Sequence, residues 1–168
     1  MNNFLQNAER TLAENRKEVI DKLMKFAVTD CILFWSPNPD LAKRQEELWL
    51  PILIWARKIF DEPLVTTAGL SVMPENMTLG EKLRSFIDSL NNRELVVFYL
   101  AAIDMRSVLL AAAFVKGKID AEKAYQAALI EEIWQAESWG KDALAEERRS
   151  SIYQELADLE AYLRETPV

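Results

Sequence analysis

A nearly continuous run of apolar residues, from Leu95 to Val115, constrains the fold of this chain more than any other stretch. The run is long enough to raise the question of a membrane-spanning helix. Asp104 and Arg106 lie in its middle, however, and charged side chains are costly in lipid. The sequence therefore predicts two buried helices, or one bent helix, at the centre of the domain.

Length and composition indicate a single folded domain. The chain has 168 residues, of which 50% are hydrophobic and 10% aromatic, enough for a core and too apolar for disorder. We expect an all-α, compact multi-helix domain of about six to eight helices over residues 1–168. At most one short extended segment is expected, at Thr29–Trp35. The expected parts are N-terminal helices over 1–27, a Pro-kinked helix over 38–60, and a helical core with a C-terminal helix over 78–165.

Helix boundaries are indicated by capping residues and breakers. Asn15, Asn38 and Thr78 each precede an apolar pattern with helical spacing, and their side chains can accept backbone N–H groups. Pro51 is expected either to kink the helix after Asn38 or to start a new one, because proline lacks an N–H. The stretch Leu64–Met77 is expected to be a connector with little regular structure.

The charge of the chain limits the partners that it is expected to bind. The formal net charge is −7 and the isoelectric point is about 4.8, with basic and acidic residues interleaved along the sequence. Such a surface repels nucleic acid and anionic membranes. We therefore expect no nucleic-acid partner and no membrane insertion, and a basic or neutral protein is the easier partner.

The scarcity of reactive side chains limits catalysis and metal binding. The sequence has no His, which removes the commonest general base and transition-metal ligand. Cys31 is the only Cys, so an intrachain disulfide is impossible and a reducing compartment fits. We expect no metal, no cofactor and no catalytic residue. The first residues are acidic and lack an apolar segment, so neither a signal peptide nor a transit peptide is expected.

The most anomalous single residue is Glu132, in a helix expected to begin after Asp120 and to end at Gly140, before Ala145. Glu132 falls in the middle of an apolar face, with Gln135 at its edge. One interpretation is a structural carboxylate, for which Arg44 and Arg106 are the candidate partners. The other is a recognition or catalytic carboxylate in a partly apolar groove.

An enzyme with paired carboxylates is a further class, and it meets a geometric difficulty. Adjacent Glu131 and Glu132 point about 100° apart on a helix and cannot form a dyad alone. Asp104 or Asp142 would have to approach Glu132. We therefore expect the chain not to be an enzyme.

Five stretches resemble, in the same order, motifs of the assembly chaperones of F-type ATP synthase that protect the free α subunit. The resemblance covers nearly the whole chain. The matching stretches are Thr29-Asp30 with the apolar residues after it, Arg44 to Ala56 (R-Q-x-x-x-W-x-P-L-L-x-W-A), Ser107 to Ala113, Gly117 to Ala124, and Glu131 to Ala143 (D-E-x-[WF]-Q-x-x-x-W-G-x-D-x-E-A).

The chain also departs from this family's pattern. Members normally begin with a β-rich N-terminal domain, which we expect this chain not to have. Arg106 stands where the family motif has Gly, Glu131 stands where it has Asp, and Leu144 stands where it has Glu. The part of the family that this chain resembles is therefore its helical domain.

The resemblance implies a function and a site. It implies a non-enzymatic chaperone that binds the α subunit of F-type ATP synthase and prevents its aggregation, in the cytoplasm of an alphaproteobacterium, or in the mitochondrial matrix if the source is eukaryotic. A separately encoded β-rich domain is a further possible partner. The alternative is an adaptor domain that has lost the complete chaperone activity with its β domain. The partner-binding residues that the resemblance implies are Glu132, Glu131, Trp134, Gln135, Trp139 and Asp142.

Overall fold

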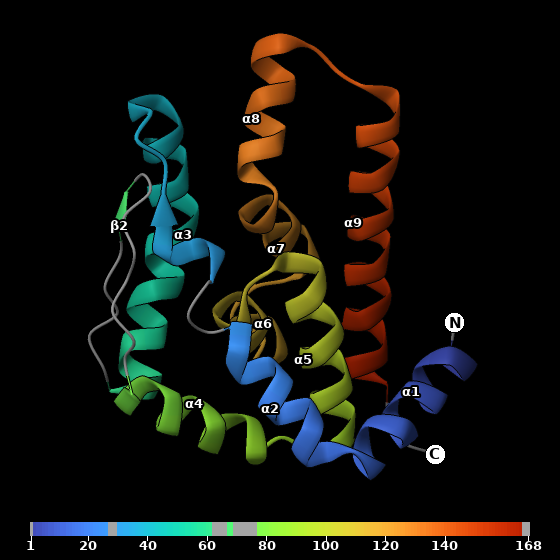
Figure 1. Ribbon diagram of the computed structural model, residues 1–168. Coiled ribbons are helices and arrows are strands. Elements are labelled where there is room, and N and C mark those ends of the chain that lie inside the picture. The colour runs from blue at the N-terminus through green and yellow to red at the C-terminus, as the bar shows by residue number, and fades with distance from the viewer. Residues whose placement is uncertain (1, 27–29, 62–66, 69–76, 166–168) are drawn as a thin grey trace.

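The computed structural model describes residues 2–26, 30–61, 67–68 and 77–165, which are mostly helical (Figure 1). The predicted all-α fold is confirmed, with nine α-helices in this described part where six to eight were expected. The helices are α1 Asn2–Glu14, α2 Arg16–Phe26, α3 Pro39–Phe60, α4 Met77–Asp88, α5 Asn92–Met105, α6 Val108–Val115, α7 Ala121–Ala128, α8 Ile130–Trp139 and α9 Ala143–Arg164.

The apolar run forms two helices, α5 and α6, at the centre of the molecule. Every residue of α6 is buried. The chain breaks between the two helices at Arg106, which ends α5 in the left-handed conformation (φ 55°) and is exposed. Ser107 then caps α6 by accepting the N–H of Leu110. Within the described residues, none of the helices combines the length and the apolar character that crossing a membrane requires.

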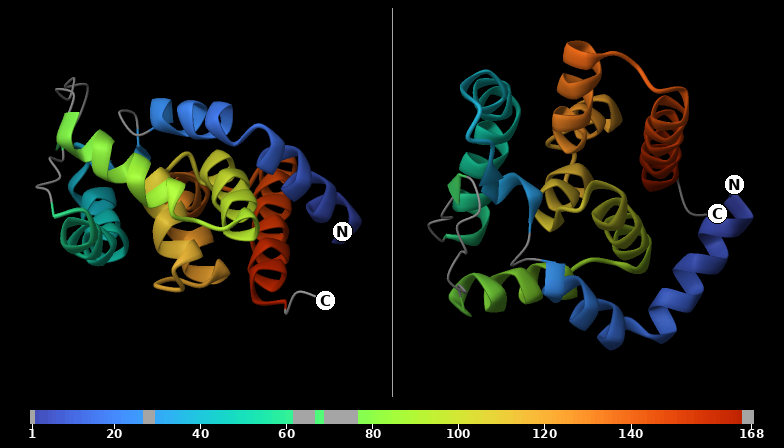
Figure 2. Two further views of the ribbon diagram at one scale, coloured as in Figure 1. Left: turned by 90° about the horizontal axis from the view of Figure 1, so that it is seen from below. Right: turned by 45° about the horizontal axis from the view of Figure 1, so that its top comes forward.

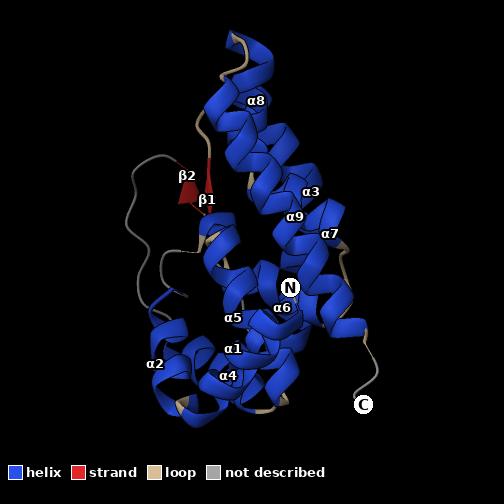
Figure 3. Ribbon diagram, turned by 90° about the vertical axis from the view of Figure 1, so that its right-hand side faces the viewer, coloured by secondary structure: helices blue, strands red, loops and turns tan. Residues whose placement is uncertain are grey.

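The other helices surround this centre. In Figure 1, α3 lies to the left of α5 and α6, and α9 lies to the right. Helix α3 packs against α6, α7 and α8, while α9 packs against α5 and α7, and α1 packs against α5. The two further views in Figure 2 show α8 between α3 and α9. The side view in Figure 3 places α8 at one end of the molecule and α2 with α4 at the other.

The long helix α3 begins as its sequence predicts. Asn38 caps it by accepting the N–H groups of Asp40 and Leu41, and Pro39 occupies the first turn. The helix continues past Pro51 to Phe60, so Pro51 does not start a new helix.

Several expected boundaries differ in the structure. The helix expected after Asp120 is divided at Leu129, whose backbone (φ −110°, ψ 19°) ends α7 and precedes α8. Helix α4 begins at Met77, which places Thr78 inside it instead of before it. The expected extended segment contains a 3₁₀ turn, Cys31–Leu33, and β1, Phe34–Trp35. A second strand, β2 (Thr67–Ala68), pairs with β1 in parallel. Met1, 27–29 and most of the predicted connector, 62–66 and 69–76, lie outside the described residues.

Asp30 is a fully buried carboxylate that joins the segment before β1 to the start of α6. Its Oδ1 accepts the Ser107 hydroxyl at 2.6 Å and the Ile32 N–H at 3.2 Å. Its Oδ2 accepts the N–H of Leu109 at 2.9 Å. Burial raises the pKa of Asp30 to about 6, although these hydrogen bonds lower it. Asp30 therefore satisfies two polar groups of a helix N-terminus that water cannot reach.

The two ends of the described chain are held together by side chains of α1, α5 and α9. The Tyr162 hydroxyl, on α9, donates to the Glu9 carboxylate of α1. Arg93 donates to the carbonyls of Tyr162 at 3.2 Å and Glu165 at 2.8 Å, and its guanidinium lies 4.4 Å from the centre of the Tyr162 ring. Burial and the Glu9 bond raise the pKa of Tyr162 to about 12. We call Glu9, Arg93 and Tyr162 the terminal contact.

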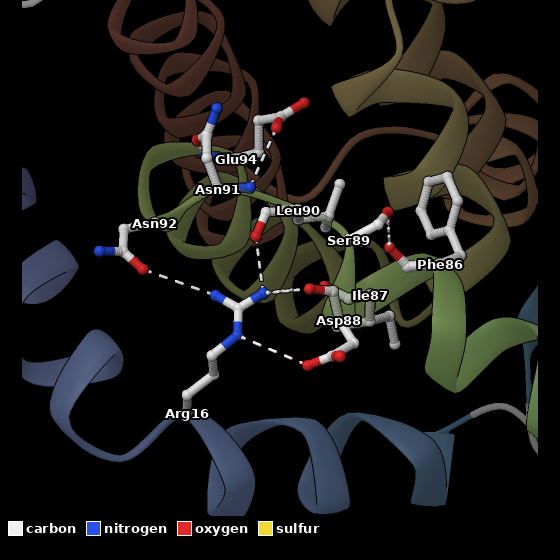
Figure 4. Close-up of polar contacts among 9 residues, drawn as sticks. All are labelled: Arg16, Phe86, Ile87, Asp88, Ser89, Leu90, Asn91, Asn92 and Glu94. Atoms are coloured by element: carbon white, nitrogen blue, oxygen red, sulfur yellow. Dashed lines mark hydrogen bonds and ion pairs between the residues drawn. The ribbon is translucent and has the colours of Figure 1, made fainter.

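Arg16, at the start of α2, binds the turn between α4 and α5 (Figure 4). Its Nη2 donates to the carbonyls of Ile87 at 3.3 Å, Asp88 at 2.8 Å and Leu90 at 2.6 Å. Its Nη1 lies 3.5 Å from the Asn92 side-chain oxygen. The last carbonyls of a helix have no hydrogen-bond partner within the helix, and the Arg16 guanidinium supplies donors to those at the end of α4.

We expect Arg16→Ala to lower the free energy of unfolding by about 2 kcal/mol, because the carbonyls of Ile87, Asp88 and Leu90 lose their charged hydrogen-bond donor. Arg84→Ala is the matched control. Arg84 forms an ion pair with Asp21 between the same two helices, α4 and α2, but both side chains are about half exposed. Such a pair contributes about 0–1 kcal/mol. Urea unfolding of both variants checks the difference, and equal losses would contradict the role assigned to Arg16.

Candidate protein-interaction surface at the α8–α9 hairpin

Helices α8 and α9 form a hairpin whose turn is built by two residues. Gly140 ends α8 with φ 98°, a backbone conformation that residues with a Cβ rarely adopt. Asp142 caps α9 by accepting the N–H of Leu144 at 3.3 Å. The hairpin brings the predicted residues of α8 beside the first turns of α9 (Figure 1).

Glu132 forms an ion pair across the hairpin with Arg148 of α9. Its two oxygens have different surroundings. Oε1 accepts from Arg148, while Oε2 is shielded from solvent and has no hydrogen-bond partner among the described residues. The Glu132 side chain as a whole is 36% exposed and that of Arg148 is 49% exposed. Glu132 is therefore a partly exposed carboxylate with one acceptor oxygen left unused.

The partners expected for Glu132 were wrong. Arg44 forms its ion pair with Glu137, five residues further along α8, and so joins α8 to α3. The hydrogen bond from Arg44 lowers the pKa of Glu137. Arg106 lies at the end of α5, where it supplies the left-handed residue of the helix terminus. Two ion pairs thus hold α8, one to each neighbouring helix.

An aromatic pair and an exposed leucine cover the end of the hairpin. The rings of Trp134 and Trp139 meet edge to face, with their centres 6.2 Å apart. Trp134 packs partly against the core, whereas Trp139 is 79% exposed. Leu144, at the start of α9, is 76% exposed. These two are the most exposed of the large apolar side chains in the described residues, and they lie at the same turn.

Some of the remaining predicted residues lie at the hairpin, and one lies elsewhere. Glu131 and Gln135 are exposed on α8, and Asp142 is the exposed cap of α9. Asp104 lies elsewhere, between α5 and α9, where it contacts Glu155. The binding role of the six predicted residues stays a prediction. Trp49 is a core residue, since it is buried and donates to the Ala127 carbonyl at 2.8 Å.

Sequence patterns missed Arg148 and Leu144, and one available signal points to Arg148. Glu132 precedes Gly140 by eight residues and Arg148 follows it by eight. In an antiparallel helical hairpin, positions equally distant from the turn face each other. No comparable signal exists for Leu144, whose exposure depends on how the turn directs the first residues of α9.

Nothing in the described residues resembles a metal or catalytic centre at Glu132. No three His, Cys, Asp or Glu side chains in this part of the chain could together hold a metal ion. The candidate second carboxylates are engaged elsewhere, Asp142 at the start of α9 and Asp104 beside Glu155. The exposed Trp139 and Leu144 and the partly exposed Glu132 are instead groups with which a protein surface can contact another protein.

Comparisons with known proteins give consistent matches. A family model described as ATP12 chaperone protein matches residues 2–57. The mitochondrial protein atp12 of Schizosaccharomyces pombe is 25% identical over 138 residues, which cover 76% of this chain and 46% of that protein. This chain therefore spans about half the length of that relative.

Solved structures extend the similarity to the fold. The crystal structure of Atp12 from Paracoccus denitrificans matches with a TM-score of 0.87 and 29% identity, over 93% of this chain and 67% of that one. The Atu1473 protein of Agrobacterium tumefaciens matches with a TM-score of 0.82 over 93% of this chain and 59% of that one. At 22% identity, this second structure shows a shared fold only.

Proposed function

We propose that the chain acts in F1 assembly as an ATP12-type chaperone, the family that its matches indicate, and that it does so by binding the free α subunit. The action proposed is not enzymatic. The chain covers an apolar surface of α that would otherwise aggregate, and it leaves when the β subunit arrives. The proposed location is the bacterial cytoplasm, or the mitochondrial matrix for a eukaryotic source.

The observation that supports this proposal is the exposed apolar end of the α8–α9 hairpin. Trp139 and Leu144 are both more than three-quarters exposed. Large exposed aromatic side chains commonly contribute most of the energy of a protein interface. The surrounding carboxylates give the surface a polar rim, which is typical of interfaces that form and separate. Glu131, Glu132, Gln135 and Asp142 are the proposed orienting groups.

The free oxygen of Glu132 suggests how the chain recognises its partner. An unsatisfied acceptor inside a protein is unfavourable. Because Oε2 is shielded from solvent in the free chain, a hydrogen-bond donor of the partner would satisfy it after a side-chain movement uncovers it, while Oε1 keeps Arg148. Binding would then give Oε2 the hydrogen bond that it lacks in the free chain, and release would remove that hydrogen bond again. We propose that this one contact selects the correct partner surface, while Trp139 supplies most of the affinity.

We propose an adaptor as the second candidate function. Since the chain covers only 46% of the Schizosaccharomyces pombe protein, its helical part would act as an adaptor if protection required a β-rich part. A separately encoded β-rich domain would be the proposed partner in that case. Binding of α without protection would distinguish the adaptor from the complete chaperone.

We expect the purified chain to suppress light scattering by isolated α subunit from the same genome. Trp139→Ala should weaken binding at least tenfold, because truncating an interface aromatic costs about 2 kcal/mol. Ile59→Ala is the matched control, since Ile59 is 50% exposed near the far end of α3. Size-exclusion chromatography measures the complex beside the scattering assay. If α aggregates equally with and without the chain and forms no complex, the proposal is wrong.

A further inference from the structure

A groove lined by residues of α1, α5 and α9 lies along the C-terminal half of α9, away from the α8–α9 turn. It encloses about 470 Å³, a volume suited to one or two large side chains or a small ligand. Its lining has an apolar part and an acidic part. We call it the acidic groove, and the residues that matter are Phe4, Ile103 and Leu159 on the apolar part and Asp104, Glu155 and Asp158 on the acidic part.

The apolar part of the acidic groove is incompletely covered. Phe4, on α1, is 62% exposed, and Ile103, on α5, is 40% exposed. Leu159 lies beneath them and is buried in the core. Two large apolar side chains are thus exposed on the walls of a concave site whose floor is already formed. Apolar surface of this kind marks sites where another molecule packs.

The acidic part contains a carboxylate pair and a third carboxylate. Asp104 of α5 and Glu155 of α9 share a hydrogen bond. Burial, this bond and the charge of Glu155 raise the pKa of Asp104 to about 8. Asp104 is therefore protonated at neutral pH, and its O–H donates a hydrogen bond to the Glu155 carboxylate. Asp158 accepts from Gln154, on the same helix, at 3.1 Å.

A cation is missing from this arrangement of charges. In the described part of the chain, the ion pairs of Arg16, Arg44, Arg84, Arg93, Lys116, Lys141, Arg148 and Arg164 all involve carboxylates other than Asp104, Glu155 and Asp158. The lining residues of α1, Phe4 and Leu5, carry no charge. The proton between Asp104 and Glu155 thus occupies a place that a positively charged group could take.

We propose that the acidic groove docks a protein segment that presents one lysine or arginine between apolar side chains. The stem of the basic side chain lies against Phe4 and Ile103, and its charged end lies between Asp104 and Glu155, with Asp158 beside it. Its apolar neighbours cover the exposed walls. Insertion of the cation favours the ionised form of Asp104, which then releases its proton to water.

A basic partner segment fits this groove better than a second copy of the chain does. The chain carries a net charge of −7, so two copies repel each other. The same charge attracts a basic segment and speeds its association. The proposal does not depend on the proposed chaperone function, because it uses none of the residues proposed to bind the α subunit.

The test uses a fluorescein-labelled helical peptide of alanine and glutamine with one arginine, and a leucine one turn before and one turn after it. Two companion peptides carry glutamine or glutamate in place of the arginine. Fluorescence anisotropy with the whole chain should show the arginine peptide binding at least tenfold more tightly than either companion. Its affinity should rise between pH 6 and pH 8.5, as Asp104 ionises, and that of the glutamine peptide should not.

Variants of the chain locate the binding. The double variant Asp104→Asn with Glu155→Gln keeps a hydrogen bond between the helices but removes the charge, and should abolish the preference for arginine and its pH dependence. Asp158→Asn, which leaves the pair intact, should weaken binding a few-fold. Glu147→Gln is the matched control, an exposed carboxylate on the same helix, and should change nothing. A thermal melt shows whether each variant is folded.

Three results would overturn the proposal. Equal affinity for the arginine and glutamine peptides would show that the groove selects no cation. Full binding of the arginine peptide by the folded double variant would place the contact elsewhere. A dimer of the chain that Phe4→Asp dissociates, seen by sedimentation, would show that the occupant is a second copy.

Discussion

Replacing Asp30 with alanine is expected to lower the free energy of unfolding by about 3–5 kcal/mol, the largest single effect on stability in this chain. The substitution leaves the Leu109 and Ile32 N–H groups and the Ser107 hydroxyl without their acceptor in a site that solvent does not reach. Each buried donor that loses its partner costs about 1–3 kcal/mol. Urea unfolding measures the loss.

Asp40→Ala is the control for this prediction. Asp40 lies in the first turn of α3 and is exposed, so its loss should cost less than about 1 kcal/mol. A loss below about 1.5 kcal/mol for Asp30→Ala would contradict the role assigned to the buried carboxylate.

The stability contributed by Asp30 should also depend on pH. Its pKa in the folded chain is about 6, above its usual value of 3.8. Protonation therefore favours the folded state, and this contribution is fully present below pH 3.8 and is lost as the pH rises through 6. Asp30→Asn cannot titrate. The difference in free energy of unfolding between the wild-type chain and Asp30→Asn should be about 1 kcal/mol larger at pH 5 than at pH 7, whereas an unchanged difference would show that Asp30 does not titrate in this range.

Glu132→Ala is expected to fold normally and to lose protection of the α subunit. Its ion pair with Arg148 is partly exposed, and such pairs contribute about 0–1 kcal/mol. Removing the unsatisfied Oε2 offsets part of that loss. Thermal stability should therefore change little, while binding of α falls at least tenfold because the proposed selecting contact is gone.

Arg148→Ala separates recognition by Glu132 from its place in the ion pair. If Glu132 contacts the partner directly, Arg148→Ala should retain most of the binding that Glu132→Ala and Glu132→Gln lose. Circular-dichroism melts and the α aggregation assay measure both properties on the same samples. Full protection by Glu132→Ala, or a strongly lowered melting temperature, would show that the assignment of Glu132 is wrong.

Local signals in the sequence predicted the framework of the fold. The charges inside the run from Leu95 to Val115 excluded a membrane span, and the run is indeed two buried helices. Asn38 and Pro39 marked the start of α3 because capping acts within one turn of the chain. The family resemblance, carried by ordered motifs along the chain, is confirmed by the comparisons.

Tertiary geometry explains what the sequence did not predict. Glu132 was expected to pair with Arg44 or Arg106, but ion-pair partners depend on how helices align, which local patterns do not contain. The break at Leu129 lacks the glycine, proline or side-chain cap that would have indicated it. Of the candidate site, the residues on α8 were predicted, whereas Arg148 and Leu144 required the hairpin to be folded.

The terminal contact has a consequence for how the chain folds during its synthesis. Glu9 and Tyr162 are separated by 153 residues, and Arg93 reaches the carbonyls of α9 from the middle of the chain. Helix α1 leaves the ribosome before α5 and α9, so its partner on α9 does not exist until the helices between them have been made. Since contacts between distant segments form late, α1 gains its final support only after α9 is released, and a nascent chain stalled before α9 would hold α1 less firmly than the finished protein does.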